Sequence, residues 1–350
     1  MNTKENKGIT LISLVVTIIV LIILAAVSIN LVVGENGLIG RAKDGTEEYK
    51  RAAQNEVNML DEIDKEIEGL YKQSLVFVVE TSDANPTYTL NMTQYLSGSV
   101  NDFIVDWGDE TTSHIQSATD SQRAHTYTNH GRHTIKIEGV AEEGFVLQGS
   151  QVKEVLTGFP ESMNIKSEMF IYTFANSDIT SIPADMFKYV PNLKYVERLF
   201  EGSKIETIPE NLFAYNTQIV CFEDTFASCK QLREIPENLF ANNVNVTSFL
   251  NTFATCTSLT SIPSNLFANN TQVVNFQYVF QNCPNIQSIP SNLFSNLTNL
   301  TDVKGAFLSC TSLTGNAIEL WNNAQITQYS DCYRNCTNLD NYASIPSAWK

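Results

Sequence analysis

The 350-residue sequence predicts a multidomain chain: an N-terminal transmembrane and stalk α-helix, a small β-sandwich, and then an α/β solenoid of short repeats. Three observations predict this order. Residues 9–33 carry no charged side chain, the helical spacing of apolar residues gives way to strand-like segments from Leu75, and an Ile-Pro dipeptide recurs at a nearly constant interval in the C-terminal half. The length is also that of two or three ordinary domains.

The composition excludes one class of partner. The chain has 38 acidic and 22 basic side chains, which gives a formal net charge of −16. A nucleic-acid-binding protein needs a basic stripe that neutralises phosphates, and docking on anionic lipid needs basic clusters. We therefore expect no nucleic-acid partner, and contact with a membrane through an apolar segment rather than through charge.

The apolar run at residues 9–33 is long enough to cross a membrane. Its 25 residues would extend about 37 Å as a helix, and a hydrocarbon core is about 30 Å thick. A buried core helix is the alternative, but a helix that is apolar all round and follows a basic start is typical of a membrane span. A cleaved secretory signal fits less well, because its apolar region is shorter.

The residues before this run resemble a known processing site. The stretch Lys7-Gly8-Ile9-Thr10-Leu11-Ile12-Ser13-Leu14 resembles the leader junction of type IV prepilins. The resemblance implies a leader at residues 1–8, cleavage between Gly8 and Ile9 by prepilin peptidase, and methylation of the new amino terminus. Ser13 replaces the family's usual Glu, and a hydroxyl cannot neutralise a neighbouring subunit's amine. This departure argues against a major filament subunit and leaves a minor or tip subunit open.

Residues 34–73 are predicted to form a stalk. Apolar residues recur there at spacings of three and four, which is the pattern of an amphipathic helix. They are Ala53, Val57, Leu60, Ile63 and Ile67. The glycines at 34, 37 and 40 are interpreted as a joint, because a phosphate loop would follow a strand and end in Lys-Ser/Thr.

Residues 74–140 are predicted to form the β-sandwich. Residues 75–79 indicate a buried strand, residues 103–109 a strand that enters a turn, and residues 132–138 a half-exposed strand. The segments 105–111 (VDWGDET), 125–127 (HTY) and 131–135 (GRHTI) resemble a PKD domain, an immunoglobulin-like sandwich of extracellular proteins. Glu110 replaces the second glycine of that family's turn, at a left-handed position that disfavours it.

All four histidines lie in this segment. His114, His125, His130 and His133 occur near Asp106, Asp109 and Glu110, which raises the question of a metal site. We expect packing and turn hydrogen bonds instead, because no cysteine joins the group and His125 and His133 occupy positions at which the resembled domain packs. No metal site and no cofactor are predicted.

Residues 141–350 repeat. Ile-Pro begins at 182, 208, 235, 262 and 289, and Cys229, Cys256, Cys283, Cys310 and Cys336 follow the same period. Residues 258–262 indicate a short strand, while Val273, Phe276 and Phe280 would share one face of a short helix. One such unit cannot bury its apolar face alone, whereas a stack can.

The repeat resembles a leucine-rich repeat of the BspA-like kind. The resemblance rests on Phe253-Ala-Thr-Cys-Thr-Ser-Leu259, and residues 320–346 look like an atypical terminal unit. The cysteine row is interpreted as buried free thiols; cross-links between neighbouring coils remain the alternative. A catalytic cysteine is not expected, because the repeat half contains no histidine.

Function is predicted from the surface of the repeats. Residues 241–301 contain no charged side chain, so amides and hydroxyls must cover that surface. These groups suit a glycan or a polar protein face, and they equally suit a surface that binds only water. The expected contacts are residues that point away from the core: Lys204, Glu206, Arg233, Thr260, Gln287 and Thr314.

The leading hypothesis is an adhesin-like binding protein on a bacterial cell surface. It would be membrane-anchored, with most of the chain outside the cell and a protein or glycan ligand. The alternative is a minor or tip subunit of a type IV pilus or secretion pseudopilus, which would bind pilin-like subunits. An extracellular enzyme comes third, because no nucleophile with a base and no paired carboxylates emerge. We therefore predict no enzymatic activity and no catalytic residue.

Overall fold

The computed structural model describes residues 73–93 and 96–350. The expected leader (1–8), membrane span (9–33) and stalk (34–73, apart from Gln73) lie outside these residues. Within the described part of the chain, no helix is both long and apolar enough to cross a membrane. The described residues all belong to one compact unit, Leu70–Lys350.

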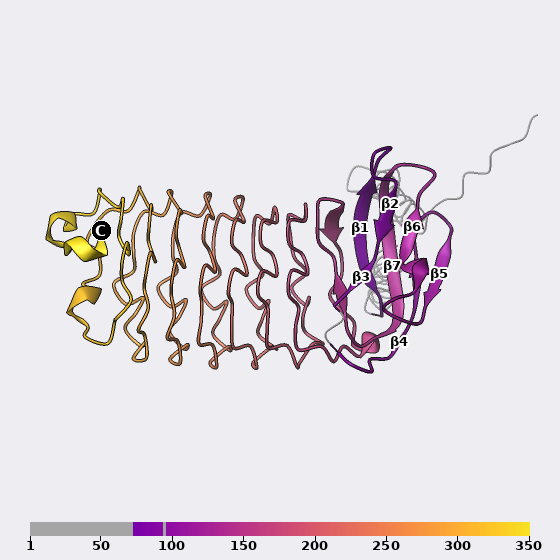
Figure 1. The fold of residues 1–350 in the computed structure, drawn as a ribbon, viewed down its shortest axis with the longest axis horizontal. Coiled ribbons are helices and arrows are strands. Elements are labelled where there is room, and N and C mark those ends of the chain that lie inside the picture. The colour runs from indigo at the N-terminus through magenta and orange to yellow at the C-terminus, as the bar shows by residue number, and fades with distance from the viewer. Residues whose placement is uncertain (1–72, 94–95) are drawn as a thin grey trace, which may run out of the picture. The chain divides into compact units, whose positions relative to one another are not determined.

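The first part of this unit is built of antiparallel strands (Figure 1). A five-stranded sheet has the order β5-β4-β7-β1-β9, and two smaller ladders pair β2 with β6 and β3 with β8. The strands are β1 (Leu75–Thr81), β2 (Thr87–Thr89), β3 (Asn91–Met92), β4 (Asn101–Asp106), β5 (Thr112–Ile115), β6 (Ala124–Thr126), β7 (Gly131–Ala141), β8 (Phe145–Val146) and β9 (Val152–Val155). A short 3-10 helix, η1 (Ser121–Arg123), precedes β6.

One face of the large sheet packs against the two ladders. Phe77 of β1 contacts Tyr88 of β2, with ring centroids 6.0 Å apart, and Phe103 of β4 meets Phe145 of β8 edge to face at 5.3 Å. β4 alternates buried and exposed residues along its length, as a strand with one buried face does. The layers therefore form a small β-sandwich.

The sandwich extends beyond its expected end at residue 140. β7 continues to Ala141, and β9 then adds a strand to the free edge of β1, with Phe77 paired to Val155. The backbone N–H of Asp178 donates to the carbonyl of Val152 in β9, at 2.8 Å. β9 thus belongs to the sheet and at the same time hydrogen-bonds to the first coil of the repeat, so the expected boundary falls inside continuous structure.

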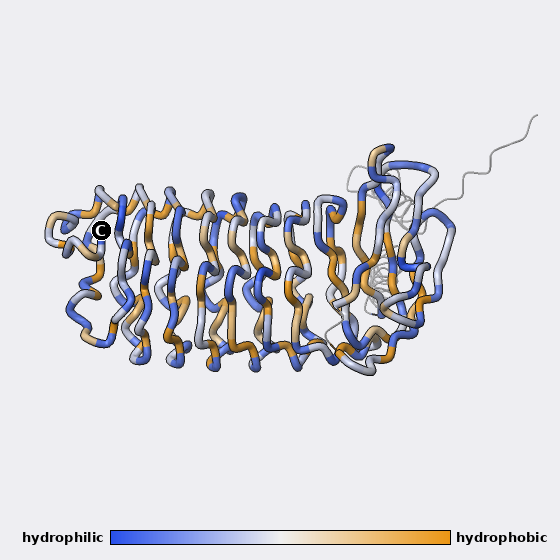
Figure 2. The backbone as a smooth tube through the Cα atoms, viewed as in Figure 1, coloured by the Kyte–Doolittle hydropathy of each residue, from blue (hydrophilic) through white to orange (hydrophobic). Residues whose placement is uncertain are grey.

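The repeat half is a solenoid of stacked coils (Figure 1). Single parallel bridges join each coil to the next at one position per repeat, which confirms the repeat period. The bridge residues are Met169, Tyr195, Cys221, Ser248, Asn275, Asp302 and Gln328. Figure 2 shows that hydrophobic residues recur in rows across successive coils.

The expected helix in each unit is wrong, so the solenoid is not of the α/β type. Among the described repeat residues there is no α-helix, and the bridge residue Asn275 lies inside the segment predicted to be helical. Val273, Phe276 and Phe280 are buried as expected. The backbone that places them there, however, is a series of turns.

Left-handed residues break the helix. Tyr278 and Asn282 have φ angles of 57° and 55°, which an α-helix cannot contain. The N–H of Phe280 donates across to Ala306 of the next coil at 2.9 Å, whereas the N–H of Gln281 donates back to Tyr278 at 3.0 Å. The backbone therefore alternates between bonds to the next coil and bonds within a turn, and it still brings every third or fourth side chain to the core.

Rows of aromatic rings fill the solenoid. One row stacks with neighbouring centroids 5.2 to 5.9 Å apart and interplanar angles of at most 14°. Its members are Phe174, Phe200, Phe226, Phe253, Phe280, Phe307 and Tyr333.

Short 3-10 helices stand at both ends of the solenoid: η2 (Glu161–Met163), η3 (Leu320–Asn322), η4 (Tyr342–Ser344) and η5 (Ser347–Trp349). At the C-terminal end, Trp349 stacks on Tyr329 with centroids 4.7 Å apart, and its carbonyl accepts from the N–H of Tyr333. This atypical last unit covers the end of the aromatic row.

Candidate functional site

Five of the six predicted contact residues lie at one position of successive coils, which we call the exposed row. They are Glu206, Arg233, Thr260, Gln287 and Thr314, one from each coil in turn. Backbone bonds hold the row in register: Arg233 N–H donates to Glu206 at 3.2 Å, and Thr314 N–H donates to Gln287 at 2.9 Å. Glu206 is half-buried and the other four side chains are exposed.

The charged end of the exposed row is paired within the protein. Arg233 Nη2 lies 2.9 Å from Glu206 Oε2. Lys204, the sixth predicted residue, lies two residues before the row and pairs with Asp178 at 2.7 Å. Lys153 reaches Asp178 as well, at 2.7 Å. Although burial opposes it, the two ammonium groups hold the pKa of Asp178 below its ordinary value. The neutral end of the row consists of Thr260, Gln287 and Thr314.

Exposed side-chain amides recur along the charge-free surface. The amide nitrogens of Asn242, Asn269 and Asn296 each donate at 3.0 Å to a backbone carbonyl of the preceding coil. All three residues are exposed. One N–H of each amide is therefore committed to holding neighbouring coils together, while the second N–H and the oxygen remain available to other partners. The regular spacing of these asparagines was the sequence signal that could have predicted this role.

A second amide ladder, which was not predicted from the sequence, lies in the core. Asn216, Asn243 and Asn270 are completely buried, and the amide nitrogen of each donates to two carbonyls. Asn243 reaches Asn216 of the preceding coil at 2.9 Å and in turn accepts from Asn270 at 2.9 Å. Val190 and Leu297 occupy the same position in flanking coils, so the ladder spans three coils.

The cysteine row has a structural role. Each of its thiols donates to the carbonyl of a phenylalanine in the preceding coil, at 3.0 to 3.2 Å. All seven cysteines are buried and free. Burial raises the pKa of Cys229, Cys283 and Cys336 to about 12, so these thiols stay protonated at neutral pH. A protonated buried thiol is a poor nucleophile and a poor partner in disulfide exchange.

Comparison with known proteins assigns the coils to a protein family. A family model described as "Mycoplasma protein of unknown function, DUF285" matches residues 164–293 and 301–350, which is more than half of the sequence. The chain belongs to this family. The matched residues of this DUF285 protein begin within the first coil and run to the C-terminus. The family description assigns no activity, ligand or partner.

Other comparisons add little. No curated protein matches the DUF285 chain. Among solved structures, the leucine-rich repeat domain of APL1 is similar at 22% identity over 50% of this chain, with a TM-score of 0.33. A TLR13–ssRNA13 complex is similar at 12% identity over 54% of this chain, with a TM-score of 0.24. The chain spans 46% and 36% of those two chains. Both scores are too low to carry an argument.

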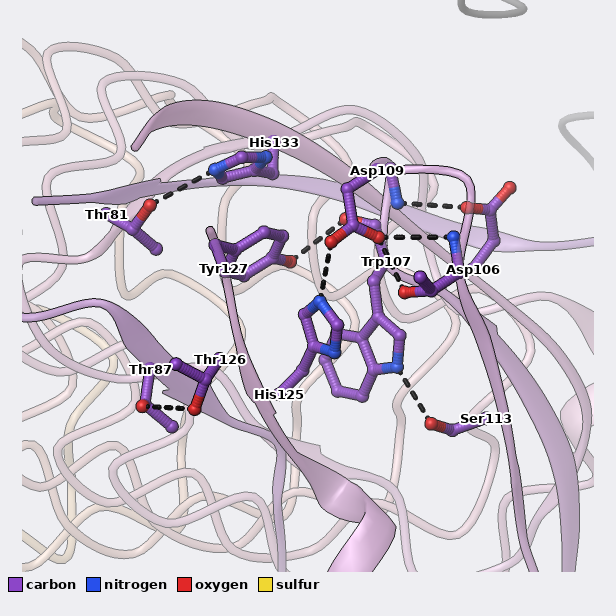
Figure 3. A network of polar contacts seen from close by, with 12 residues as sticks. Thr81, Thr87, Asp106, Trp107, Asp109, Ser113, His125, Thr126, Tyr127 and His133 are labelled. Atoms are coloured by element: carbon purple, nitrogen blue, oxygen red, sulfur yellow. Dashed lines mark hydrogen bonds and ion pairs between the residues drawn. The ribbon is translucent and has the colours of Figure 1, made fainter. Parts of the chain in front are cut away.

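The histidines of the DUF285 protein lie in the sandwich, where the structure gives them separate partners. His125 Nε2 contacts Asp109 at 2.7 Å, and its ring stacks on Trp107 with centroids 5.0 Å apart (Figure 3). His133 stacks on Tyr127 and lies 3.1 Å from the hydroxyl of Thr81. His114 and His130 contact Asp102 and Asp83, respectively. The described residues contain no group of three or more side chains suited to a metal ion.

The turn around Trp107 is built by side-chain hydrogen bonds (Figure 3). The indole of Trp107 donates to Ser113 at 2.9 Å, its carbonyl accepts from the hydroxyl of Tyr127 at 2.9 Å, and Asp109 accepts from Thr111 at 2.6 Å. Glu110 adopts the expected left-handed conformation, with φ at 73°. The contacts fix a turn and a core.

Proposed function

We propose that this chain is an adhesin-like binding protein that contacts its ligand along the exposed row. The observation that carries the proposal is the row itself. It presents one side chain per coil at a repeated backbone position, held by hydrogen bonds between coils. A preformed surface loses little conformational entropy on binding, so several weak contacts can add to a useful affinity.

The neutral end of the row suits a glycan or a polar protein face. Thr260, Gln287 and Thr314 offer hydroxyl and amide groups, and the exposed amides of Asn242, Asn269 and Asn296 offer further acceptors elsewhere on the coils. The ion pair between Arg233 and Glu206 leaves little unbalanced charge in the row, and Lys204 beside it is paired with Asp178. Recognition of this kind involves no chemical step, so the proposal assigns no catalytic residue and no cofactor.

Display on a bacterial surface is the second part of the proposal, and the sequence supports it. The resemblance of residues 7–14 to a prepilin junction implies that prepilin peptidase cleaves between Gly8 and Ile9. Residues 9–33 would then anchor the chain in the membrane, the PKD-like sandwich would act as a spacer, and the coils would form a BspA-like leucine-rich repeat. The solenoid would face the outside of the cell.

A minor or tip subunit of a pilus or pseudopilus is the alternative, which the prepilin-like junction favours. Ser13 counts against a major subunit, because it lacks the charge that the usual Glu provides. Both the adhesin and the pilus-subunit proposals assume prepilin-type processing, and mass spectrometry of the native N-terminal peptide tests it. A methylated Ile9 supports it. An intact Met1, or a start beyond residue 33, contradicts the pilin-like interpretation.

Binding itself is tested by placing the full-length protein on printed arrays of glycans and of surface proteins. Thr260→Asp with Gln287→Asp puts two charges into the row, and we expect signals from the recognised ligand to fall by about tenfold. Thr271→Asp with Gln272→Asp makes the same two changes at exposed positions outside the row, and signals should be kept. An equal response of the two double variants would reject the row as the contact surface.

A further inference from the structure

Every coil contains two left-handed residues four positions apart, and they form two rows along the solenoid. The first row has φ angles from 53° to 61° and consists of Tyr172, Arg198, Asp224, Asn251, Tyr278, Gly305 and Asp331. The second has φ angles from 54° to 68° and consists of Asn176, Gly202, Ser228, Thr255, Asn282, Ser309 and Asn335. Residues in both rows have the same left-handed backbone conformation, but their side chains differ greatly in size.

The side chains of the first row are costly for the fold. Glycine, asparagine and aspartate tolerate the left-handed region, whereas large side chains are uncommon there. The second row uses only small residues, which shows what the backbone alone requires. Tyr172, Arg198 and Tyr278 in the first row therefore need a separate explanation, and strained residues of this kind concentrate at functional sites.

Packing explains Tyr278 but not the other two. A Cβ atom at Gly305 would lie 2.2 Å from the ring of Tyr278, so that ring covers the glycine of the next coil. Tyr172 instead has 39% of its surface exposed. The guanidinium of Arg198 lies 5.4 Å from the centre of its ring and also pairs with Asp224 at 3.4 Å. Exposed contacts of this kind stabilise weakly, but they hold both side chains in one arrangement.

Unbalanced negative charge lies beside these two residues. Arg198 pairs with Glu201 at 3.5 Å and with Asp224 at 3.4 Å. The carboxyls of Glu197 and Glu223 lie near each other and form no ion pair within the described part of the chain. Glu223 accepts from Ser248 at 2.8 Å, while Oε2 of Glu197 is buried with no hydrogen-bond partner among the described residues. Burial, together with the nearby Glu223 carboxylate, raises the pKa of Glu197. A cation brought by a partner would relieve this repulsion.

We propose that Tyr172, Arg198 and Asp224, with Glu197 and Glu223 beside them, form a docking strip for an extended basic segment of a partner polypeptide. The strip crosses three successive coils in one line. Tyrosine and arginine are the residue types most often found at the energetic centres of interfaces. Their fixed positions reduce the entropy lost on docking, and a lysine or arginine of the partner pairs with Glu197 and Glu223. The inference rests on the proposed binding function but uses a different segment of each coil.

Fluorescence anisotropy of a short labelled peptide in which lysine and serine alternate tests the strip on the full-length protein in non-ionic detergent. We expect binding that weakens with salt. Glu197→Gln with Glu223→Gln should weaken it about tenfold. Glu234→Gln with Glu237→Gln removes the same charge at exposed positions of another segment and should weaken it less than about twofold. No binding, or equal weakening by both pairs, would overturn the proposal.

Asparagine variants separate docking from a structural role. Tyr172→Asn should weaken peptide binding and leave Tm unchanged or higher, because asparagine suits the left-handed position. Tyr278→Asn should lower Tm, because it uncovers Gly305, and should leave peptide binding unchanged. If Tyr172→Asn lowers Tm and leaves binding intact, the strip is structural. The two proposals can fail separately. If the peptide does not bind, but array signals still depend on the exposed row, the strip is rejected and the proposed function stands.

Discussion

The buried asparagine ladder gives a sharp test of how the coils are held together. Replacing Asn243 by alanine removes two hydrogen bonds, to the carbonyl of Phe213 at 3.3 Å and to that of Asn216 at 2.9 Å. Each carbonyl keeps one backbone donor, from Asn216 and Ile219 respectively, so neither is left without a partner. The cost is thus two net hydrogen bonds of about 1 kcal/mol each, plus the cavity left by the amide.

Removing the amide also removes a buried oxygen that has no partner, which offsets part of this cost. We expect Asn243→Ala to lower the free energy of unfolding by about 2 kcal/mol, measured by urea unfolding of the full-length protein followed by far-UV circular dichroism. Asn242→Ala is the matched control. Asn242 is exposed and makes one bond, to Ala214, so its loss should cost about 0.5 kcal/mol or less. Equal losses at the two positions would refute the ladder as a stabilising element.

Three further predictions concern other parts of the chain. All seven cysteines should resist a thiol-specific reagent until the protein is unfolded, because burial keeps the thiols protonated; rapid labelling of the native protein would contradict this. Gly305→Ala should cost about 1–3 kcal/mol in thermal unfolding, since a Cβ there meets the ring of Tyr278, and Tyr278→Ala should recover part of the loss. Hydrogen bonds from Thr111 and His125 keep the pKa of Asp109 low against the opposing effect of burial. Its contribution to stability is therefore present above its unfolded pKa of about 4 and is lost as pH falls through the lower folded value. Asp109→Asn should then destabilise the sandwich at neutral pH and flatten its acid unfolding curve. The curve is followed by tryptophan fluorescence with Trp321 and Trp349 replaced by phenylalanine, so that only Trp107 reports; an unchanged curve would contradict the assigned bonds.

The sequence predicted the solenoid because the same residue types recur at a constant interval. A repeated Ile-Pro, a repeated phenylalanine and a repeated cysteine can recur in the same register only if each unit adopts the same structure. The burial of Phe276 and Phe280 followed for the same reason. The repeat also predicted which residues share the exposed row, since equal positions in successive units must align.

The conformation within each unit was harder to predict. Spacings of three, four and seven at Val273, Phe276 and Phe280 are typical of a helix, but consecutive turns with left-handed residues produce the same spacing. Glycine is the residue most typical of a left-handed conformation, and the first left-handed row contains one glycine, Gly305. Tyr278 and Arg198 are in the same row, and neither residue type signals a left-handed conformation in the sequence. Tertiary hydrogen bonds between coils decide the outcome, and they cannot be read from one unit alone.

The sandwich boundary was missed for a related reason. Residues 152–155 are too few to predict a strand from their pattern alone, and their pairing partner β1 lies more than seventy residues earlier. Residues 152–155 form a strand because they pair with the free edge of β1. The local sequence pattern does not reveal that edge. A fragment that begins at residue 150 would remove β9 from its sheet, so tests of the solenoid are best made on the full chain.

Site-specific photo-crosslinking on intact cells tests the central claim most directly. A photoreactive amino acid at Thr260 would lie in the middle of the exposed row, and the same residue at Thr271 would lie in the same repeat outside the row. The account predicts a discrete adduct at Thr260 that is absent or much weaker at Thr271. Adducts of equal yield at both positions, or none at Thr260, would contradict the claim that this protein binds its ligand along the exposed row.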